Sequence, residues 1–310
     1  MKASAPGKII LFGEHAAVYG RPALAVPVTQ VHADVEVLDS ARAGIWINAP
    51  GVDLHAELNS LPGNHPIAAG IHGLFQLCGI SQPCALEVTI LSSIPVASGL
   101  GSGAAVSVAL VRALALHIGH TLTDQQVNEL VFDIERLHHG TPSGIDNTVI
   151  TYAKPVFFIK GRPIETFKVG KPFTVVIAGT GIPAPTKESV ADVRRLWMQD
   201  KEKVEKIFDE IGQISMSARR VIENGKPESL GELMDKNHQL LQELTVSSPD
   251  LDHLVQAARR AGAVGAKMSG GGRGGNMIAL VEKEKAESVE NALVSAGAKG
   301  TIVTVIESSK

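Results

Sequence analysis

Short continuous runs of apolar residues along the chain predict buried strands. In the N-terminal half three segments predict strands, "KIILF" (8–12), "PALAVPV" (22–28) and "ALEVTIL" (85–91), and two of them are continuously apolar. Apolar runs of about four to eight residues are typical of strands, and a run without polar positions indicates burial on both faces. We therefore expect strands at these three places.

Two longer stretches predict helices. Residues 104–118 are apolar nearly all round, which is typical of a helix enclosed in a core. Residues 123–140 begin with a capping-box pattern, Thr123 to Gln126, and end at a glycine that is soon followed by proline. Inside this stretch apolar residues recur at the spacing of one helix face, at Val127, Leu130, Val131, Ile134 and Leu137.

The alternation of strands and helices restarts near residue 170. A strand, "FTVVIAG" (173–179), precedes a long and mostly helical stretch over about 186–261. The end of the chain predicts a strand, "NMIALV", then an amphipathic helix, then a strand, "TIVTVI". We therefore predict an α+β fold with two domains, residues 1–170 and residues 171–310.

Composition and charge exclude several classes of protein. The chain has 310 residues, 44% hydrophobic and 20% charged, as expected for a globular protein with a large core. The net charge is -3 with both signs dispersed, so neither nucleic acid nor a membrane is expected as a partner. The apolar run after Lys8 is too short for a secretion signal. Cys78 and Cys84 cannot form a disulfide framework, and we expect free thiols in a reducing, cytoplasmic compartment.

A glycine-rich segment, "PVASGLGSGAA" (95–105), lies between a predicted strand and a predicted helix. Gly99, Gly101 and Gly103 carry no Cβ, so backbone N–H groups can approach an anion closely. The helix that follows, from about Ala104, directs its positive end at the same place. The segment therefore indicates a phosphate-binding loop, although a tight turn without a ligand fits the same residues.

A dinucleotide-binding loop is a second interpretation of this segment. Gly99, Gly101 and Ala104 satisfy the pattern G-x-G-x-x-G/A after a predicted strand. That fold needs a second strand ending in an acidic residue about 20 residues further on. Here "HTLTDQQ" leads directly into another helix, which argues against a nicotinamide cofactor. The chain also lacks a Walker-type phosphate loop and a G-x-S-x-G nucleophile motif.

Two further segments carry charged side chains beside glycine and proline. "APGKIILFGEHAAVYG" places Lys8 and Glu14 at the two ends of an apolar run. "HGTPSGIDN" presents Asp146 from a loop, shortly after the amphipathic helix that carries Glu135. Each charge alone is typical of a solvated surface. Together with a phosphate loop they supply what phosphoryl transfer requires: a carboxylate for Mg²⁺, a carboxylate near the attacking hydroxyl, and a lysine to offset developing charge.

At these segments the sequence resembles the GHMP small-molecule kinases, and more closely the mevalonate kinases among them. The resemblance extends over nearly the whole chain and rests on the motifs "PGKIILFGEHAAVYG", "PVASGLGSGAA", "HGTPSGIDN" and "KMSGGGRGGN". The segment "TGIPAPTKESVADVR" is also similar to the one that follows the first strand of the C-terminal domain in mevalonate kinases. The resemblance implies a ribosomal-S5 second-domain-like N-terminal domain and a ferredoxin-like C-terminal domain.

The resemblance also implies roles for individual residues. Asp146 becomes the catalytic base or hydroxyl-orienting group, and Lys8 its neighbour that keeps the carboxylate ionised and stabilises transition-state charge. Glu135, helped by Ser102, is expected to bind Mg²⁺. Glu14, His15 and Asp146 are expected to contact the acceptor. The expected ATP-binding residues are Pro95, Val96, Ala97, Ser98, Gly99, Leu100, Gly101, Ser102, Gly103 and Ala104.

Two positions depart from the family pattern. Gly103 stands where many relatives have a second serine, and Arg273 interrupts what is usually an unbroken glycine run. Metal dependence, ATP affinity and activity are the properties that these departures put in question.

The activity implied by the resemblance is ATP- and Mg²⁺-dependent phosphorylation of the primary hydroxyl of mevalonate, in isoprenoid precursor biosynthesis. Phosphomevalonate or homoserine could replace mevalonate as the acceptor, because the family motifs define the chemistry better than the acceptor. Outside this class, a dinucleotide-dependent oxidoreductase and a protein of the same fold that binds ligand without turnover stay open. The oligomeric state is open too, and a homodimer is compatible with the sequence.

Overall fold

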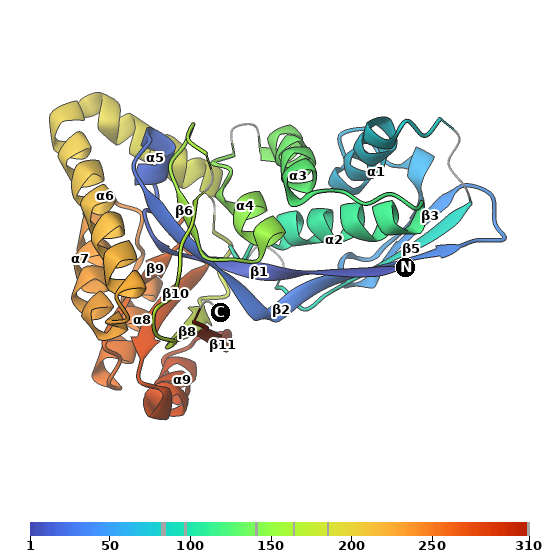
Figure 1. Ribbon diagram of the computed structural model, residues 1–310. Helices are drawn as coiled ribbons and strands as arrows, with labels where there is room; N and C mark the ends of the chain where they lie inside the picture. The colour runs from blue at the N-terminus through green and yellow to red at the C-terminus, as the bar shows by residue number, and fades with distance from the viewer. Residues whose placement is uncertain (82–84, 96–97, 140–141, 164, 185, 309–310) are drawn as a thin grey trace. The chain divides into compact units, whose positions relative to one another are not determined.

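The structure is a computed structural model that describes residues 1–310 except 82–84, 96–97, 140–141, 164, 185 and 309–310 (Figure 1). It divides into two compact units. Unit 1 contains Met1–Lys8, Pro27–Val96 and Leu100–Ala153, and unit 2 contains Ile9–Val26, Ala97–Gly99 and Lys154–Lys310. Each unit has its own strands and helices.

Unit 1 is built on a mixed β-sheet with the strand order β4-β3-β5-β2, in which β1 also pairs with β2. Pairing between β2 and β5 is antiparallel, and pairing between β3 and β5 is parallel. The strands are β1 (Lys2–Phe12), β2 (Ala23–Asp39), β3 (Ile45–Ala49), β4 (Leu54–Glu57) and β5 (Leu86–Ser92), so the three predicted N-terminal strands are confirmed. Strands β1 and β2 continue into unit 2, where Ala23–Ala25 pair with β6.

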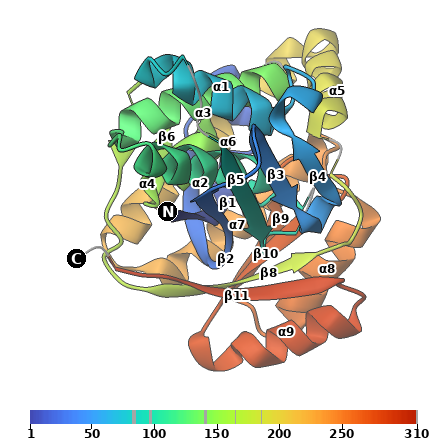
Figure 2. The same cartoon turned by 90° about the vertical axis from the view of Figure 1, so that its right-hand side faces the viewer.

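The helices of unit 1 are α1 (Pro66–Cys78), α2 (Ser102–His117), α3 (Asp124–His139) and α4 (Ile145–Tyr152), with short 3₁₀ turns η2 (Pro50–Val52) and η3 (Leu58–Ser60). Helix α2 contacts the other three helices and also β5 (Figures 1 and 2). These contacts on all sides explain why its sequence is apolar nearly all round.

The predicted start of α3 is confirmed in detail. The Thr123 hydroxyl accepts a hydrogen bond from the Gln126 N–H (3.2 Å), and the Gln126 side-chain oxygen accepts one from the Thr123 N–H (2.9 Å). This reciprocal pair is a capping box. Val127 and Val131 are fully buried, whereas Leu137 is 61% exposed, so the apolar face ends before the last turn of the helix.

Unit 2 contains an antiparallel sheet with strand order β11-β8-β10-β9. Its strands are β8 (Phe173–Gly179), β9 (Gly265–Ser269), β10 (Asn276–Val281) and β11 (Gly300–Ile306). Helices lie between β8 and β9 and between β10 and β11, which gives the βαββαβ order of a ferredoxin-like fold. The predicted α+β fold is therefore confirmed.

The helices of unit 2 are α5 (Thr186–Gln199), α6 (Lys201–Glu223), α7 (Leu230–Glu243), α8 (Pro249–Arg260) and α9 (Ala286–Ser295). Short elements complete the unit: η1 (Ala16–Tyr19), β6 (Val156–Phe158), β7 (Glu165–Thr166), η4 (Pro227–Ser229) and η5 (Lys283–Lys285). A Cβ at Gly265 of β9 would lie 2.4 Å from the carbonyl oxygen of Gly231 in α7, so glycine permits this close packing. No helix among the described residues is long and apolar enough to cross a membrane.

Candidate active site

The glycine-rich segment leads directly into helix α2. The helix begins at Ser102, earlier than the sequence pattern indicates, and Gly101 precedes it in the left-handed region (φ 77°). Because the first N–H groups of a helix have no partner within it, the start of α2 offers donors and a positive dipole end to an anion. Of the ten predicted ATP-binding residues, Val96 and Ala97 lie outside the described residues.

Gly101 lies directly against Lys8. A Cβ at this position would stand 2.7 Å from Ile150 Cδ1 and 3.0 Å from Lys8 Cγ. The backbone N–H of Lys8 also donates a hydrogen bond to the Leu100 carbonyl oxygen (2.9 Å). Strand β1 therefore holds the lysine beside the start of α2, and a larger residue at position 101 would displace it.

Lys8 forms an ion pair with Asp146. Their Nζ and Oδ1 atoms are 3.0 Å apart, with the lysine side chain 5% exposed and the aspartate side chain 35% exposed. Asp146 lies in the first turn of α4. The expectation of a loop at this residue is therefore wrong, because Gly144 (φ 87°) begins a helix and the apolar residues that follow it are buried. A first-turn carboxylate is stabilised by the helix dipole.

Glu135 of α3 lies close to the same helix start. Its Oε1 would be 3.6 Å from a Cβ built on Gly103. The Glu135 pKa is raised to about 7, mainly by burial and also by repulsion from Asp146, while Lys8 opposes the shift. In unit 1, two carboxylates and one ammonium group are thus gathered beside the N-terminus of α2, where Ser102 begins the helix.

In unit 2 the residues Glu14 and His15 follow the end of β1. The Glu14 carboxylate accepts a hydrogen bond from Lys267 Nζ, and both side chains are fully buried. His15 has a left-handed backbone (φ 59°), and its Nε2 lies 3.1 Å from the Gly271 carbonyl oxygen. Since a carbonyl only accepts, the proton must be on Nε2. The His15 pKa is lowered to about 4, mainly by burial and also by the charge of Arg273, while the bond to Gly271 opposes the shift, so the ring is neutral near pH 7.

The rest of the first motif packs against α6. The Tyr19 ring stacks on Phe208 with centroids 4.3 Å apart. Arg21 donates hydrogen bonds to Asp209 (3.0 Å) and to Glu205. These contacts hold the turn η1 against helix α6. Glu14 and His15, which directly precede the turn, are held there as well.

The side chain of Arg273, which interrupts the glycine run, contacts α5. Its Nη1 donates to Asp192, and its Nε lies 3.3 Å from the Thr245 carbonyl oxygen. The hydrogen bond from Arg273 is the main cause of the lowered Asp192 pKa. The guanidinium is therefore occupied within unit 2 by a carboxylate and a carbonyl.

Sequence reasoning assigned no role to two side chains at the C-terminal motif. Lys267 stands in the middle of β9 and holds Glu14, and the Asn276 amide donates to the Ser98 carbonyl oxygen at the start of the phosphate loop (2.5 Å). The sequence did carry a signal that these two residues have a role. Buried strands rarely contain a lysine flanked by small and apolar residues, or an asparagine that follows a glycine run.

Comparisons with known proteins agree with this geometry. The models for the GHMP kinases N terminal domain and for the GHMP kinases C terminal match residues 66–154 and 218–299. The mevalonate kinase of Pyrococcus horikoshii is 35% identical over 314 residues, covering 95% of this chain and 92% of that protein. The mevalonate kinase of Archaeoglobus fulgidus is 35% identical over 288 residues, and the match covers 92% of this chain and 94% of that protein. The chain belongs to the mevalonate kinases of the GHMP kinase superfamily.

A solved structure extends this agreement to three dimensions. The crystal structure of L. major mevalonate kinase in complex with R-mevalonate has a TM-score of 0.85 and 28% identity, and the match covers 100% of this chain and 96% of that one. The family membership makes this chain an ATP-dependent small-molecule kinase, and the dinucleotide-dependent oxidoreductase is excluded.

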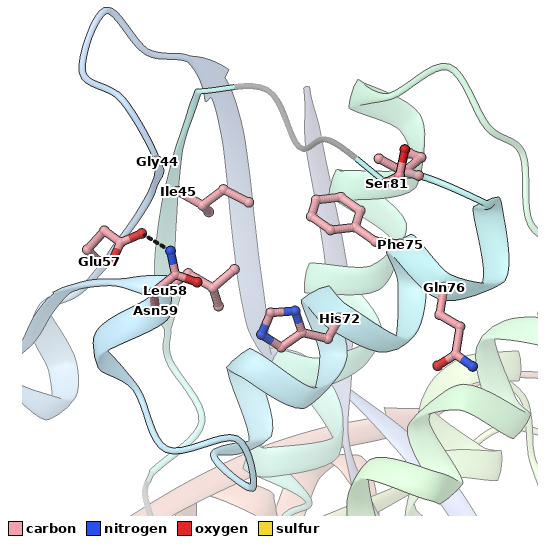
Figure 3. A pocket seen from close by; sticks show the side chains of 10 residues that line it. Gly44, Ile45, Glu57, Leu58, Asn59, His72, Phe75, Gln76 and Ser81 are labelled. Atoms are coloured by element: carbon pink, nitrogen blue, oxygen red, sulfur yellow. Dashed lines mark hydrogen bonds between the residues drawn. The ribbon is translucent and has the colours of Figure 1, made fainter.

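A cavity of about 360 Å³ in unit 1 is separate from the kinase residues (Figure 3). It is lined by residues of α1, β3, the end of β4 and the turn η3, including His72, Phe75, Glu57 and Asn59. The Asn59 amide donates a hydrogen bond to the Glu57 carboxylate (2.9 Å). Figures 1 and 2 place α1 and β3 away from α4. Lys8, Glu135 and Asp146 do not line this cavity.

His238 of α7 is a buried histidine that supports β9. Its Nδ1 accepts a hydrogen bond from the Met268 N–H (3.3 Å), so its proton is on Nε2, which lies 3.1 Å from Asp252 Oδ1. The His238 pKa is lowered to about 4, mainly by burial and also by the charges of Lys267 and Arg259, while Asp252 opposes the shift. A second proton would have to occupy Nδ1, where it would meet the Met268 N–H.

We expect stability to fall as the pH drops below about 6.5. An unfolded histidine binds a proton near pH 6.5, whereas folded His238 does so only near pH 4. The unfolded state therefore gains protons first, and His238 contributes a loss that reaches about 3 kcal/mol near pH 4. Urea unfolding at pH 7.5, 6.0 and 5.0 should show a smaller decline in His238→Gln than in the parent. His253→Gln, which replaces an exposed histidine of α8, is the control; equal declines in all three proteins would contradict the expectation.

Proposed function

We propose that this chain transfers the γ-phosphoryl group of ATP to the primary hydroxyl of mevalonate, in the synthesis of isoprenoid precursors. The observation that carries the proposal is the Lys8–Asp146 ion pair beside the N-terminus of α2, in a chain about one-third identical to mevalonate kinases over nearly its full length. The L. major relative of the same family was solved with R-mevalonate, which supports this acceptor over phosphomevalonate, homoserine or galactose.

Asp146 is the group that we assign to the acceptor hydroxyl. Its side chain is 35% exposed and so can reach a ligand, while its partner Lys8 is buried and held by the backbone at Leu100. The carboxylate accepts the hydroxyl proton or orients the hydroxyl for attack on the γ-phosphorus. The Lys8 ammonium offsets the negative charge that develops during transfer.

The residues from Ser98 to Ala104 are assigned to the phosphates of ATP. The N–H groups at the start of α2 are donors without helical partners, and the left-handed Gly101 keeps side-chain atoms away from them. The Asn276 amide fixes the Ser98 carbonyl at the beginning of this loop. Phosphate binding therefore depends on backbone N–H groups, which can donate to any of the equivalent phosphate oxygens.

The residues fit a Mg²⁺ ion that is bound together with ATP. The Glu135 pKa is raised by burial and also by repulsion from Asp146, and a cation would favour the charged carboxylate against both effects. Among the described residues no group of three or more His, Cys, Asp and Glu side chains could hold a metal alone. Glu135 and the Ser102 hydroxyl would therefore share the ion with phosphate oxygens and water. When bound, the ion neutralises charge on the β- and γ-phosphates.

Glu14 and His15 are assigned to the acceptor. Glu14 Oε2 and His15 Nδ1 are buried acceptor atoms without a hydrogen-bond partner among the described residues. Buried polar atoms are nearly always satisfied in folded proteins, so two such atoms in adjacent residues indicate a ligand that donates. The hydroxyl groups of mevalonate are donors of this kind. Since the His15 ring is neutral, it contributes a hydrogen bond and no charge.

ADP release with ATP, Mg²⁺ and a panel of acceptors tests the proposed function. We expect kcat/KM for mevalonate to exceed that for phosphomevalonate, homoserine and galactose by at least about 100-fold, because a site built to hydrogen-bond one acceptor rejects analogues that leave its polar groups unpaired. Comparable values for mevalonate and galactose would refute the assignment. ATP binding without ADP release on any acceptor would favour a binding protein of the same fold.

The second prediction concerns Asp146 and Lys8 as a unit. Asp146→Asn should lower kcat by about 10²–10⁴-fold, the usual contribution of a positioned base, while ATP still binds. Lys8→Met should also lower kcat, and the double variant should lose less than the product of the two single losses. ATP affinity from calorimetry is the control for folding. Multiplicative losses would mean that the two residues act independently.

The third prediction concerns Gly103, where many relatives have serine. A Cβ there would stand 3.6 Å from Glu135 Oε1, an ordinary contact, so a side chain fits. Gly103→Ser should supply an oxygen ligand in place of water and lower the Mg²⁺ concentration for half-maximal rate about two- to tenfold, with the KM for mevalonate nearly unchanged. Gly103→Ala adds the methylene without the oxygen and is the matched control. Identical Mg²⁺ titrations of the serine and alanine variants would exclude this role.

A further inference from the structure

Lys267 is a charged side chain that lies entirely in the interior of unit 2. It stands in the middle of β9, opposite Ile278 of β10, and it is 0% exposed. Its Nζ donates to Glu14 and to the Met268 carbonyl oxygen (2.6 Å). The pair joins the C-terminal motif to the first motif across 253 positions of sequence.

Stability alone is a poor reason for such a pair. Moving two charges out of water costs several kcal/mol per ion, and apolar residues of similar volume often serve as well or better. What an ion pair adds over apolar packing is direction, because the carboxylate oxygen has to face the ammonium group. Here one Glu14 oxygen faces Lys267, while the other is left without a partner among the described residues.

The backbone around Glu14 needs to be held in place. Gly13 before it has φ 98°, and His15 after it has φ 59°, a region that costs a non-glycine residue roughly 1–2 kcal/mol. Such conformations persist only where the surroundings over-determine them. Backbone hydrogen bonds to the Gly13 and His15 carbonyls contribute to this. The side chains of Glu14 and His15 are held by Lys267 and by the Gly271 carbonyl, and both of these contacts come from the C-terminal motif.

The lysine is itself held through Met268. The Met268 carbonyl accepts from Lys267, and its N–H donates to His238, which is fixed by Asp252. Asp252 Oδ1 also accepts from the Ser247 hydroxyl (2.5 Å). The backbone N–H and C=O groups of Met268 are therefore both bonded to side chains, which restricts the position of β9 next to Lys267.

We propose that Lys267 is a positioning residue: its ion pair orients the Glu14 carboxylate and, through the adjoining backbone, the His15 ring toward the acceptor. The proposal rests on the proposed function of Glu14 and His15. Lys267 does not touch the substrate and has no part in binding ATP. Its loss should therefore raise the KM for the acceptor and leave the KM for ATP unchanged.

The steady-state test uses Lys267→Met, Lys267→Arg and a control, Ser269→Ala. The control removes another bond between β9 and β1, from the Ser269 hydroxyl to the Ile10 carbonyl oxygen (2.8 Å), without touching Glu14. Below the melting temperature of each variant, Lys267→Met should raise the KM for mevalonate at least about tenfold and change that for ATP less than about twofold. Lys267→Arg, which keeps the charge, should recover part of the loss. A Lys267→Met protein with the kinetic constants of Ser269→Ala would overturn the proposal.

A double variant covers the case in which Lys267→Met does not fold, since a lone buried carboxylate is costly. Glu14→Gln with Lys267→Met carries no buried charge. If Lys267 acts through Glu14, this double variant should lose no more kcat/KM for mevalonate than Glu14→Gln alone. A further loss of tenfold or more would mean that Lys267 has another role.

A measurement without turnover separates this proposal from the proposed function. Long-range ¹H–¹⁵N NMR of the ring nitrogens of His15, assigned with His15→Gln, reports the tautomer and hydrogen bonding of the ring in the free protein. We expect the His15 signals to shift in Lys267→Met, or in the double variant, and to stay unchanged in Ser269→Ala. Unchanged signals in the lysine variants would refute the positioning role even if mevalonate is phosphorylated. A shifted His15 in a protein that ignores mevalonate would leave the positioning role standing and the proposed acceptor wrong.

Discussion

The structure depends on the need of buried ammonium groups for a carboxylate partner. Lys8 in unit 1 and Lys267 in unit 2 are both almost without exposure, and an unpaired buried charge costs several kcal/mol. The two pairs differ in one respect: Asp146 is 35% exposed, whereas Glu14 is fully enclosed with its lysine. In the open pair Asp146 can therefore exchange contacts with a ligand directly, while in the closed pair Lys267 can act only through Glu14, whose second carboxylate oxygen has no partner among the described residues.

The open pair also explains the composition of the phosphate loop. Lys8 lies so close to Gly101 that a Cβ there would meet its side chain at 3.0 Å. Glycine at this position therefore serves two purposes, since it allows the left-handed turn into α2 and leaves room for the lysine. If a phosphate binds at the start of α2, the helix N–H groups and the Lys8 ammonium would both stabilise its negative charge.

Sequence reasoning was accurate where a pattern is local. The capping box of α3, the apolar helix α2 and the strands β8, β10 and β11 each follow from spacing within about 20 residues, whereas β9 was not predicted as a strand. It was wrong for Asp146, because a glycine that starts a helix and a glycine in a loop look alike in sequence. It gave Lys267 no role, because the Glu14 that explains this lysine is 253 positions away, and only a folded chain brings the two together. The domain boundary near residue 170 remains a prediction.

Backbone strain in unit 2 is concentrated where side chains compensate for it. His15, Thr245 and Arg273 all have φ between 58° and 59°. His15 is fixed by the Gly271 carbonyl, and Arg273 is fixed by Asp192 while it donates to the Thr245 carbonyl. A glycine at 273 would adopt the same φ without strain but would supply none of these bonds. Arg273 therefore ties the glycine loop to α5 through Asp192, although its own backbone is strained.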